Sequence, residues 1–281
     1  MESSSLNEQA ERNDTFQLDL KAVIKNKNPR LLKILPGFIL SLIRRIIHED
    51  EMNDFLRRNQ GKWGLDFANA ILEEFVTDLT IIGQDNIPDS GRYIVAGNHP
   101  LGGLDGIALI SVVGRKWKDI VFPVNDLLMN IPQLRPLFIP INKHGSNAQN
   151  VKILNDTFAS DKMILYFPAG LVSRKQNGKI KDLEWKKTFI TKARQFKRDI
   201  LPVYFAGRNS SFFYNLANFR KSLGIKANLE MFFLVDEVYK QKGKNMSMVF
   251  GEPISWKTFD RSHPDTYWAK QVMDTVYSLK P

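Results

Sequence analysis

The sequence predicts an α/β fold, with a mixed, partly parallel central sheet flanked by helices and preceded by an N-terminal helical extension. Short apolar runs of strand length alternate with segments whose apolar residues recur at helical spacing, from residue 66 to the end of the chain. No linker rich in Pro, Gly or Ser divides the chain after about residue 80. We therefore expect residues 1–65 to form a tail and a helical extension, and residues 66–281 to form one domain.

The extension combines a polar start with an apolar, basic segment. Residues 1–14 are polar and acidic, unlike a secretory signal, which predicts a disordered tail on a protein that stays in the cytoplasm. Residues 31–47 are mostly apolar with basic edges, and Pro36 and Gly37 interrupt them. The uninterrupted part is shorter than the ~20 residues of a spanning helix. Two interpretations remain: a helix lying in an anionic membrane interface, or an amphipathic helix packed on the domain.

The elements of the domain follow in alternation. Helical patterns cover residues 66–76, 106–114, 148–159, 185–197, 212–222 and 268–279. Strands are expected at residues 79–82, 93–96, 120–124, 137–141, 163–167, 200–205, 230–235 and 246–250. Because no helix separates the last two of these strands, we expect them to add an antiparallel edge to the sheet.

Composition limits the chemistry that the chain can perform. It has no cysteine, which excludes disulfides, thiol nucleophiles and cysteine zinc sites and suits a reducing compartment. A formal net charge of +10 indicates anionic partners, such as a membrane surface, an acidic carrier protein or a phosphorylated substrate. No zinc-finger spacing, zipper or single-strand binding motif is present, so we expect no nucleic-acid partner.

Two enzyme classes lack their motifs. No Gly-x-Ser-x-Gly elbow occurs, which argues against a serine hydrolase of the α/β class. The histidines, at positions 48, 99, 144 and 263, are far apart in sequence and form no His-x-x-x-His pair, so we expect no metal site.

The segment from Asn98 to Gly106 carries the most chemistry. His99 directly follows a predicted strand, and Asp105 begins a predicted helix, with Gly102 and Gly103 allowing a tight turn between them. An imidazole with a pKa of ~6.5 can take a proton from a hydroxyl, and a carboxylate can orient its other ring nitrogen. No enzyme nucleophile accompanies the pair, so the acceptor substrate is expected to be the nucleophile. On spacing alone, Asp105 also fits a helix N-cap.

This segment resembles the His/Asp motif of the glycerolipid (lysophosphatidic acid type) acyltransferase superfamily. Five residues separate His99 from Asp105, one more than in most members, and this form with its Gly-Gly pair resembles the bacterial hemolysin-like and ornithine- or glycine-lipid O-acyltransferase branch. The likeness continues in order through residues 137–143, 167–174 and 200–203, which correspond to the second, third and fourth family blocks.

The resemblance implies residue roles. His99 would be the general base and Asp105 its orienting partner. Substrate-binding residues are expected in the first three blocks, namely Asn98, Gly102, Gly103, Asn142, Lys143, Gly170, Ser173 and Arg174. Arg208 and Asn209, just after the strand expected to end at residue 205, are further candidates for binding the headgroup or the acyl carbonyl.

The resemblance also implies a reaction. A fatty acyl chain would pass from a thioester, carried by acyl carrier protein or coenzyme A, to the hydroxyl of a lyso-lipid, with no metal or other cofactor. The protein would be peripheral, on an anionic membrane surface at the cytoplasmic face.

The third block departs from the phosphoglycerol enzymes, which have Glu and Thr where this chain has Ala169 and Leu171. That departure favours a lyso-aminolipid acceptor, such as lyso-glycine or lyso-ornithine lipid, over 1-acylglycerol-3-phosphate, which remains the alternative. A non-enzymatic, hemolysin-like membrane-binding protein is an alternative from another class, but it does not explain why the His/Asp turn and the headgroup blocks occur together.

Overall fold

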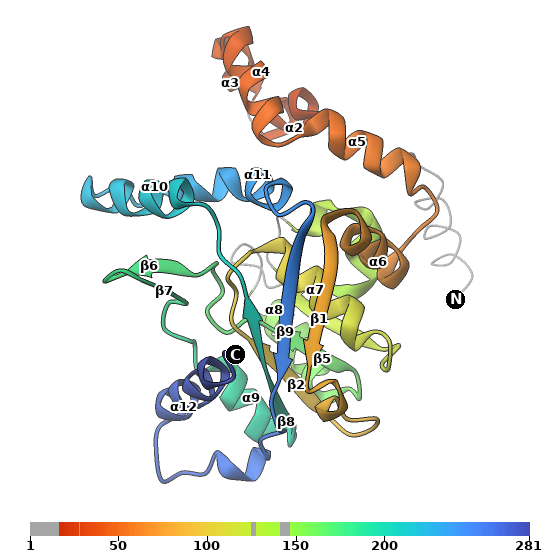
Figure 1. The fold of residues 1–281 in the computed structure, drawn as a ribbon, viewed down its shortest axis with the longest axis vertical. Helices are drawn as coiled ribbons and strands as arrows, with labels where there is room; N and C mark the ends of the chain where they lie inside the picture. The colour runs from red at the N-terminus through yellow and green to blue at the C-terminus, as the bar shows by residue number, and fades with distance from the viewer. Residues whose placement is uncertain (1–16, 28, 125–127, 141–146) are drawn as a thin grey trace.

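The computed structural model of the chain describes residues 17–27, 29–124, 128–140 and 147–281. A seven-stranded sheet lies at its centre (Figure 1). From one edge to the other its strands are β1 (Val76–Ile82), β9 (Lys244–Phe250), β8 (Asp199–Ala206), β2 (Tyr93–Gly97), β5 (Met163–Tyr166), β3 (Ile120–Val124) and β4 (Phe138–Pro140). Neighbouring strands run parallel, except that β8 and β9 are antiparallel. The expected mixed, partly parallel sheet is confirmed.

Helices cover both faces of this sheet. On one face lie α6 (Gly64–Phe75) and α7 (Gly103–Val113), and on the other lie α8 (Asn147–Ala159), α9 (Thr188–Phe196) and α12 (Asp265–Ser278). Side chains alternate along each strand, so Val95 of β2 joins the α6–α7 core while Ile94 joins the α9–α12 core. The helix α7 is apolar on all sides because it is buried between the sheet and α6.

Shorter elements complete the described part of the domain. A separate antiparallel hairpin pairs β6 (Arg174–Gln176) with β7 (Lys179–Lys181). The remaining α-helices are α10 (Ser211–Ser222) and α11 (Leu234–Tyr239). The 3-10 helices are η1 (Gln84–Asn86), η2 (Leu128–Asn130), η3 (Pro132–Leu137), η4 (Leu229–Phe233) and η5 (Trp256–Thr258).

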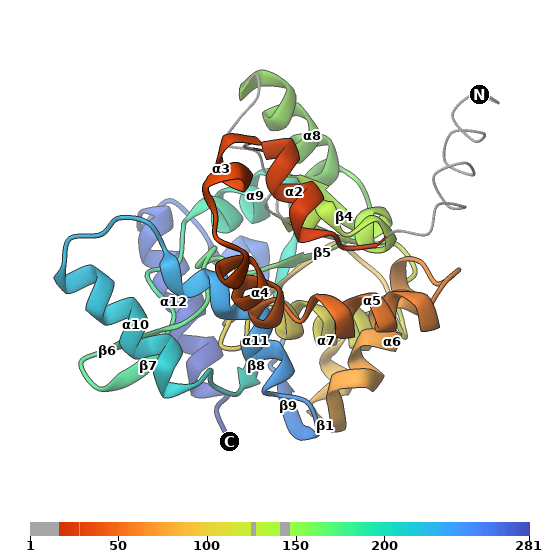
Figure 2. The ribbon, with the colours of Figure 1, turned by 90° about the horizontal axis from the view of Figure 1, so that it is seen from above.

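Within the described residues, the helices that precede the domain are α2 (Leu20–Lys27), α3 (Pro29–Ile34), α4 (Gly37–Ile46) and α5 (Glu49–Arg58). The break predicted at Pro36 is confirmed, since α3 ends before it and α4 begins after it. None of the helices in the described ranges has the length and apolar content needed to cross a bilayer. Seen from above, these helices lie over the same side of the molecule as α10 and α11 (Figure 2).

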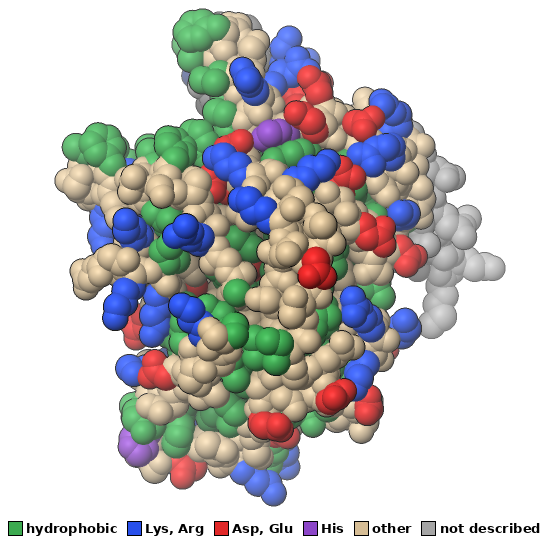
Figure 3. All heavy atoms as spheres, viewed as in Figure 1, with side chains coloured by type: hydrophobic (Ala, Val, Ile, Leu, Met, Phe, Trp, Pro, Cys, Tyr) green, Lys and Arg blue, Asp and Glu red, His purple; other side chains and the backbone are tan. Residues whose placement is uncertain are grey.

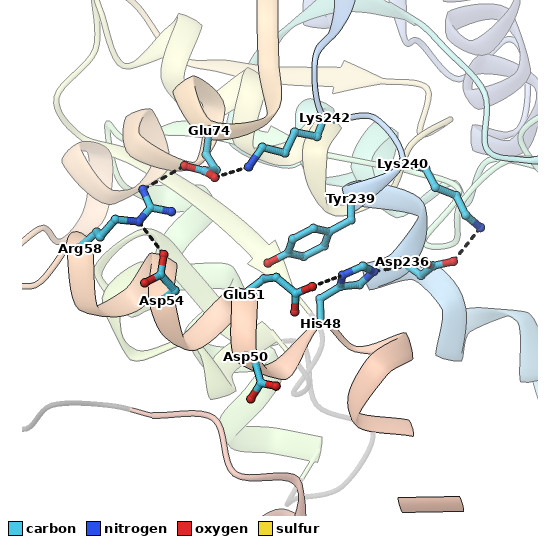
Figure 4. Close-up of a pocket in the computed structure, with 10 residues that line it drawn as sticks. All are labelled: His48, Asp50, Glu51, Asp54, Arg58, Glu74, Asp236, Tyr239, Lys240 and Lys242. Atoms are coloured by element: carbon cyan, nitrogen blue, oxygen red, sulfur yellow. Dashed lines mark hydrogen bonds and ion pairs between the residues drawn. The ribbon is translucent and has the colours of Figure 1, made fainter. Parts of the chain in front are cut away.

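Aromatic and polar contacts attach these helices to the domain around a cavity of about 640 Å³ (Figure 4). The His48 ring stacks on Tyr239 with 3.9 Å between centroids, and its Nε2 lies 3.1 Å from an Asp236 carboxylate oxygen. Arg58 donates a hydrogen bond to Glu74 of α6 at 3.2 Å. The junction between α4 and α5 is therefore fixed against α11.

Two predictions at the C-terminal side of the sheet are wrong. Residues 230–235, expected to be a strand, form η4 and the start of α11. This conformation buries the Glu230 carboxylate between Arg174 and Arg220, an arrangement that a strand in the sheet does not provide. The strand β9 is antiparallel to β8 as expected but does not form an edge, because β1 pairs with its other side.

Candidate active site

The His/Asp turn lies where three parallel strands end together. The strand β2 lies between β5 and β8, and the carboxyl ends of such strands are the usual place for an active site in an α/β sheet. The strand ends at Gly97 and α7 begins at Gly103, so residues 98–102 form the connection. The Gly97 position is closely packed, since an added Cβ would lie 2.8 Å from a Val203 methyl group.

Asn98 fixes the start of this turn. Its side-chain amide donates to the Phe205 carbonyl at 2.9 Å and accepts from the Phe205 N–H at 2.7 Å. The side chain thereby extends the pairing of β2 with β8 by one step. Because both amide groups are engaged in these bonds, the structure places Asn98 as a support of the turn rather than in contact with an open site.

His99 and Asp105 are brought together as the sequence predicted. The imidazole Nδ1 lies 3.2 Å from an Asp105 carboxylate oxygen. The two groups are within reach but are not aligned, since Nδ1 of His99 and Oδ1 of Asp105 have no hydrogen-bond partner in the described part of the chain. With Nδ1 turned toward Asp105, Nε2 is the ring nitrogen left for a substrate proton.

Asp105 also holds the turn. Its Oδ2 accepts hydrogen bonds from the N–H groups of Leu101, at 2.8 Å, and Gly102, at 3.1 Å, so it caps the first turn of α7 as well as facing His99. The carboxyl group is completely buried, and this burial raises its pKa, while the His99 ring and the Leu101 N–H act in the opposite direction. A positive charge on His99 would compensate this buried carboxylate, so Asp105 stabilises the imidazolium that forms when His99 accepts a proton.

A second buried carboxylate, Asp182, supports the same histidine. Its Oδ1 accepts from the His99 backbone N–H at 3.2 Å and from the Ser173 hydroxyl at 2.5 Å, and its Oδ2 accepts from the Trp185 indole at 2.9 Å. Burial raises the pKa of Asp182, against these hydrogen bonds. Asp182 has no signal in the sequence, because it lies 83 positions after His99 and no spacing pattern links the two.

The ring of His99 has an aromatic neighbour. Phe167 stacks on it with 4.0 Å between centroids and an interplanar angle of 23°. Phe122 and Phe205 meet Phe167 edge to face, at 5.3 and 5.8 Å. This apolar wall fixes the plane of the imidazole and keeps that side of the site dry.

The third block, residues 167–174, contacts the catalytic turn through a backbone hydrogen bond. The Ser173 N–H donates to the His99 carbonyl at 2.8 Å, which joins the block to the catalytic turn. The Arg174 guanidinium is largely buried, where it donates to Glu230 at 2.8 Å and to the Val172 carbonyl at 2.6 Å. Arg174 therefore uses these hydrogen bonds to hold the segments beside the catalytic turn together. Gly170 is exposed, with a positive φ of 66°.

The remaining predicted residues have different surroundings. Gly102 has a φ of 81°, and an added Cβ there would lie 3.1 Å from Leu234 of α11, while Gly103 faces open space. Arg208 is exposed, and Asn209 is buried with no hydrogen bond to its side-chain amide among the described residues. Asn142 and Lys143 lie outside the described residues. Within those residues, no three carboxylate or imidazole side chains are placed to bind a metal ion.

Comparisons with known proteins relate this chain to a family. A family model described as "Acyltransferase" matches residues 22–277. The lyso-glycine lipid O-acyltransferase of Bacteroides thetaiotaomicron is 48% identical over 266 residues, which cover 94% of this chain and 98% of that protein. The lyso-glycine lipid O-acyltransferase of Phocaeicola vulgatus is 46% identical, over 94% of this chain and 95% of its own. A crystal structure of the 1-acyl-sn-glycerophosphate (LPA) acyltransferase PlsC from Thermotoga maritima aligns over 75% of this chain and 76% of its own, with 19% identity and a TM-score of 0.47.

Proposed function

The chain belongs to the acyltransferase family, and on that premise we propose that it moves a fatty acyl chain from a thioester donor to the hydroxyl of a lyso-glycine lipid. Two proteins that share nearly half of its sequence over almost their full length carry out O-acylation of that lipid, according to their names. The observation that carries the proposal is the pairing of His99 with buried Asp105 at the carboxyl end of β2. An imidazole and a carboxylate in this arrangement form a general base whose nucleophile comes from the substrate.

The reaction then follows from the geometry of the turn. The acceptor hydroxyl donates a hydrogen bond to Nε2 of His99, which takes the proton while the oxygen attacks the thioester carbonyl. Asp105 stabilises the resulting imidazolium across 3.2 Å. When the tetrahedral intermediate collapses, the C–S bond breaks, the ester C–O bond remains, and the imidazolium returns its proton to the departing thiolate. The thioester is already an activated acyl group, so the scheme needs no metal.

The developing oxyanion lies near the start of α7 in this scheme. The N–H groups of Leu101 and Gly102 already donate to Asp105 and do not serve the oxyanion. The first turn of a helix nevertheless presents further N–H groups and the positive end of its dipole. We assign oxyanion stabilisation to the N-terminal turn of α7, which begins at the exposed Gly103.

The third block supports an acceptor without a glycerol phosphate. Ala169 is buried in the core cluster that includes Trp185 and Phe189. A glutamate at that position would place a carboxylate in an apolar environment, and Leu171 offers no hydroxyl. Recognition of the acceptor therefore rests on other groups, of which exposed Arg208 suits the carboxylate of a glycine headgroup.

A peripheral position on a membrane completes the proposal. Phe38 and Leu42 on α4 are 72% and 52% exposed, and Arg44 and Arg45 occupy its last turn. Apolar and basic side chains on one short helix suit the surface of an anionic bilayer. The lack of cysteine suits the reducing cytoplasmic side, where acyl carrier protein and coenzyme A supply thioesters.

The acceptor is tested with purified protein and detergent-dispersed lyso-lipids. The protein is incubated with lyso-glycine lipid, lyso-ornithine lipid or lysophosphatidic acid, each with acyl carrier protein and coenzyme A thioesters, and the products are measured by mass spectrometry. We expect diacylated glycine lipid as the main product. Acylation of lysophosphatidic acid alone would contradict the proposed acceptor while leaving the base assignment intact.

A further inference from the structure

Helix α10 is apolar on two sides. Its inner side, with Phe213 and Tyr214, is buried. Its outer side carries Phe212, Phe219 and Leu223, which are 49%, 62% and 58% exposed and recur at helical spacing. A surface helix of a globular protein normally packs a single apolar stripe against the protein core. The outer stripe of α10 therefore has a purpose other than packing against the core.

The exposed apolar surface continues beyond the helix. We call it the α10–η4 face and define it by six exposed side chains: Phe212, Phe219, Leu223, Ile225, Leu229 and Phe232. An edge-to-face contact between Phe212 and Phe233, with 5.0 Å between centroids, connects α10 to η4. In Figure 3, hydrophobic side chains gather over α10 and over the α3–α4 region on the same upper side of the molecule.

The charge around this face has one sign. Residues 207–229 contain four basic side chains, Arg208, Arg220, Lys221 and Lys226, and no Asp or Glu. The first acidic residue after them, Glu230, is buried and paired with two arginines. With Arg220 neutralised by Glu230, the exposed Arg208, Lys221 and Lys226 leave this segment cationic, so it complements an anionic partner.

The face is rigidly joined to the catalytic turn. Glu230 of η4 accepts from Arg220 of α10 and from Arg174 of β6, at 2.5 and 2.8 Å. The neighbour of Arg174 in the chain, Ser173, donates its N–H to the His99 carbonyl. On α11, the residue Leu234 lies against Gly102 of the same turn. An object that binds the α10–η4 face is thus held at a fixed position relative to His99.

We propose that the α10–η4 face is a second membrane-docking surface, which binds an anionic lipid bilayer and holds the His99 turn beside the interface. The proposal rests on the proposed function, because a lyso-lipid acceptor enters from a bilayer. Exposed Phe and Leu side chains enter the headgroup and acyl boundary, and Lys221 and Lys226 contact anionic headgroups. Together with α4, the face provides two points of contact on the upper side of the molecule (Figures 1 and 3). Leu234 of α11 connects this side to the active-site turn at Gly102.

The direct test measures vesicle binding and acyl transfer by one set of variants. The triple variant Phe212→Ser, Phe219→Ser, Leu223→Ser is sedimented with vesicles of phosphatidylcholine and phosphatidylglycerol, and with vesicles of phosphatidylcholine alone. We expect it to bind the anionic vesicles at least about tenfold more weakly than the unmodified protein. It should acylate vesicle-embedded lyso-glycine lipid slowly, yet keep its rate on acceptor dispersed in detergent to within about twofold.

Two further variants complete the test. Lys221→Glu with Lys226→Glu changes only exposed charges, so it should fold normally and lose its preference for anionic over neutral vesicles. Tyr267→Ser removes an exposed aromatic ring from α12 and should bind vesicles like the unmodified protein.

Three outcomes would overturn the docking proposal: unchanged vesicle binding by both multiple variants, a change in self-association instead of vesicle binding, or loss of acyl carrier protein binding alone. Absence of lyso-glycine lipid acylation in detergent by the unmodified protein would contradict the proposed function, while the vesicle measurement would still report on docking.

Discussion

At the scale of single residues, the site depends on two buried carboxylates that hold one histidine. Asp105 faces the His99 ring and Asp182 holds its backbone N–H. The first could be predicted, because Asp105 lies in the same short turn and belongs to a known motif. The second could not, since the contact forms only when residues far apart in sequence are packed against each other.

Asp182 is a positioning residue, and its replacement by asparagine tests that role. The Asn side chain would turn an N–H₂ group toward donors that now bond to the Asp182 carboxylate. The hydrogen bonds from these donors would weaken, and the His99 backbone would be held less firmly. We expect Asp182→Asn to lower kcat by about 10- to 100-fold while KM for both substrates stays within about twofold.

The matched control is Tyr277→Phe, which removes the hydroxyl that accepts from the Asp182 N–H but leaves the carboxylate in place. It should keep most of kcat. A variant Asp182→Asn that lost stability yet kept its full kcat would refute a positioning role.

The burial of Asp105 predicts a pH dependence of stability. Its pKa is raised above the ordinary value of 3.8, so the unfolded chain gives up this proton at lower pH than the folded protein does. Stability from this group is complete below about pH 4 and is lost as the pH rises through the raised pKa. Asp105→Asn cannot ionise. The free energy of unfolding of the wild type, minus that of Asp105→Asn, should therefore fall as the pH of the urea titrations is raised above about 4. A difference that rises with pH would indicate a lowered pKa instead.

At the scale of elements, apolar periodicity predicted most of the sheet and of the helices that cover it. The strands around β2 and the helix α7 are apolar runs of the expected length, so their pattern and their burial agree. The segment at residues 230–235 is equally apolar, but its conformation follows from the ion pairs of Glu230, which no local pattern reveals. The helical pattern at residues 212–222 likewise does not reveal that the outer stripe of α10 is exposed.

Arg198 shows how one side chain joins several elements. It is completely buried and donates to the backbone carbonyls of Tyr93, Phe158, Ser160 and Lys162, at the start of β2, the end of α8 and the turn before β5. Burial lowers its pKa to about 10, so it stays charged at neutral pH. These bonds fix the start of the strand that carries the active-site turn.

Replacing this arginine should destabilise the whole fold. Arg198→Met removes the donor that these four carbonyl groups share, although Arg92 still donates to those of Phe158 and Ser160, and we expect the free energy of unfolding to fall by about 3 kcal/mol. Urea titration measures this loss. Arg194→Met, a change to a partly exposed arginine on α9, is the control and should cost much less. Equal losses in the two variants would show that the carbonyl network contributes little.

At the scale of the whole molecule, the N-terminal helices lie on the same side as α10 and α11 (Figures 1 and 2). Leu234 of α11 lies against Gly102 of the active-site turn. Composition predicted an anionic partner, and residues 31–47 left two interpretations of their helix open. The structure has features of both, because Leu40 of α4 is buried while Phe38 and Leu42 are exposed.

The exposed side of α4 is tested separately from the α10–η4 face. Phe38→Ser with Leu42→Ser removes only exposed apolar side chains, so we expect weaker sedimentation with anionic vesicles by about tenfold and an unchanged melting temperature. Ile82→Ser, at an exposed position on β1, should have no such effect. Full vesicle binding by the α4 variant would restrict membrane contact to other parts of the surface.

The most direct test of the account is the rate of acyl transfer to lyso-glycine lipid in detergent by His99→Ala. Detergent separates chemistry from membrane docking, and the exposed His263→Ala provides a matched control. We predict that His99→Ala loses at least about 100-fold in kcat/KM with little change in melting temperature, while His263→Ala keeps the wild-type rate. Transfer by His99→Ala at the wild-type rate would contradict the assignment of His99 as the base.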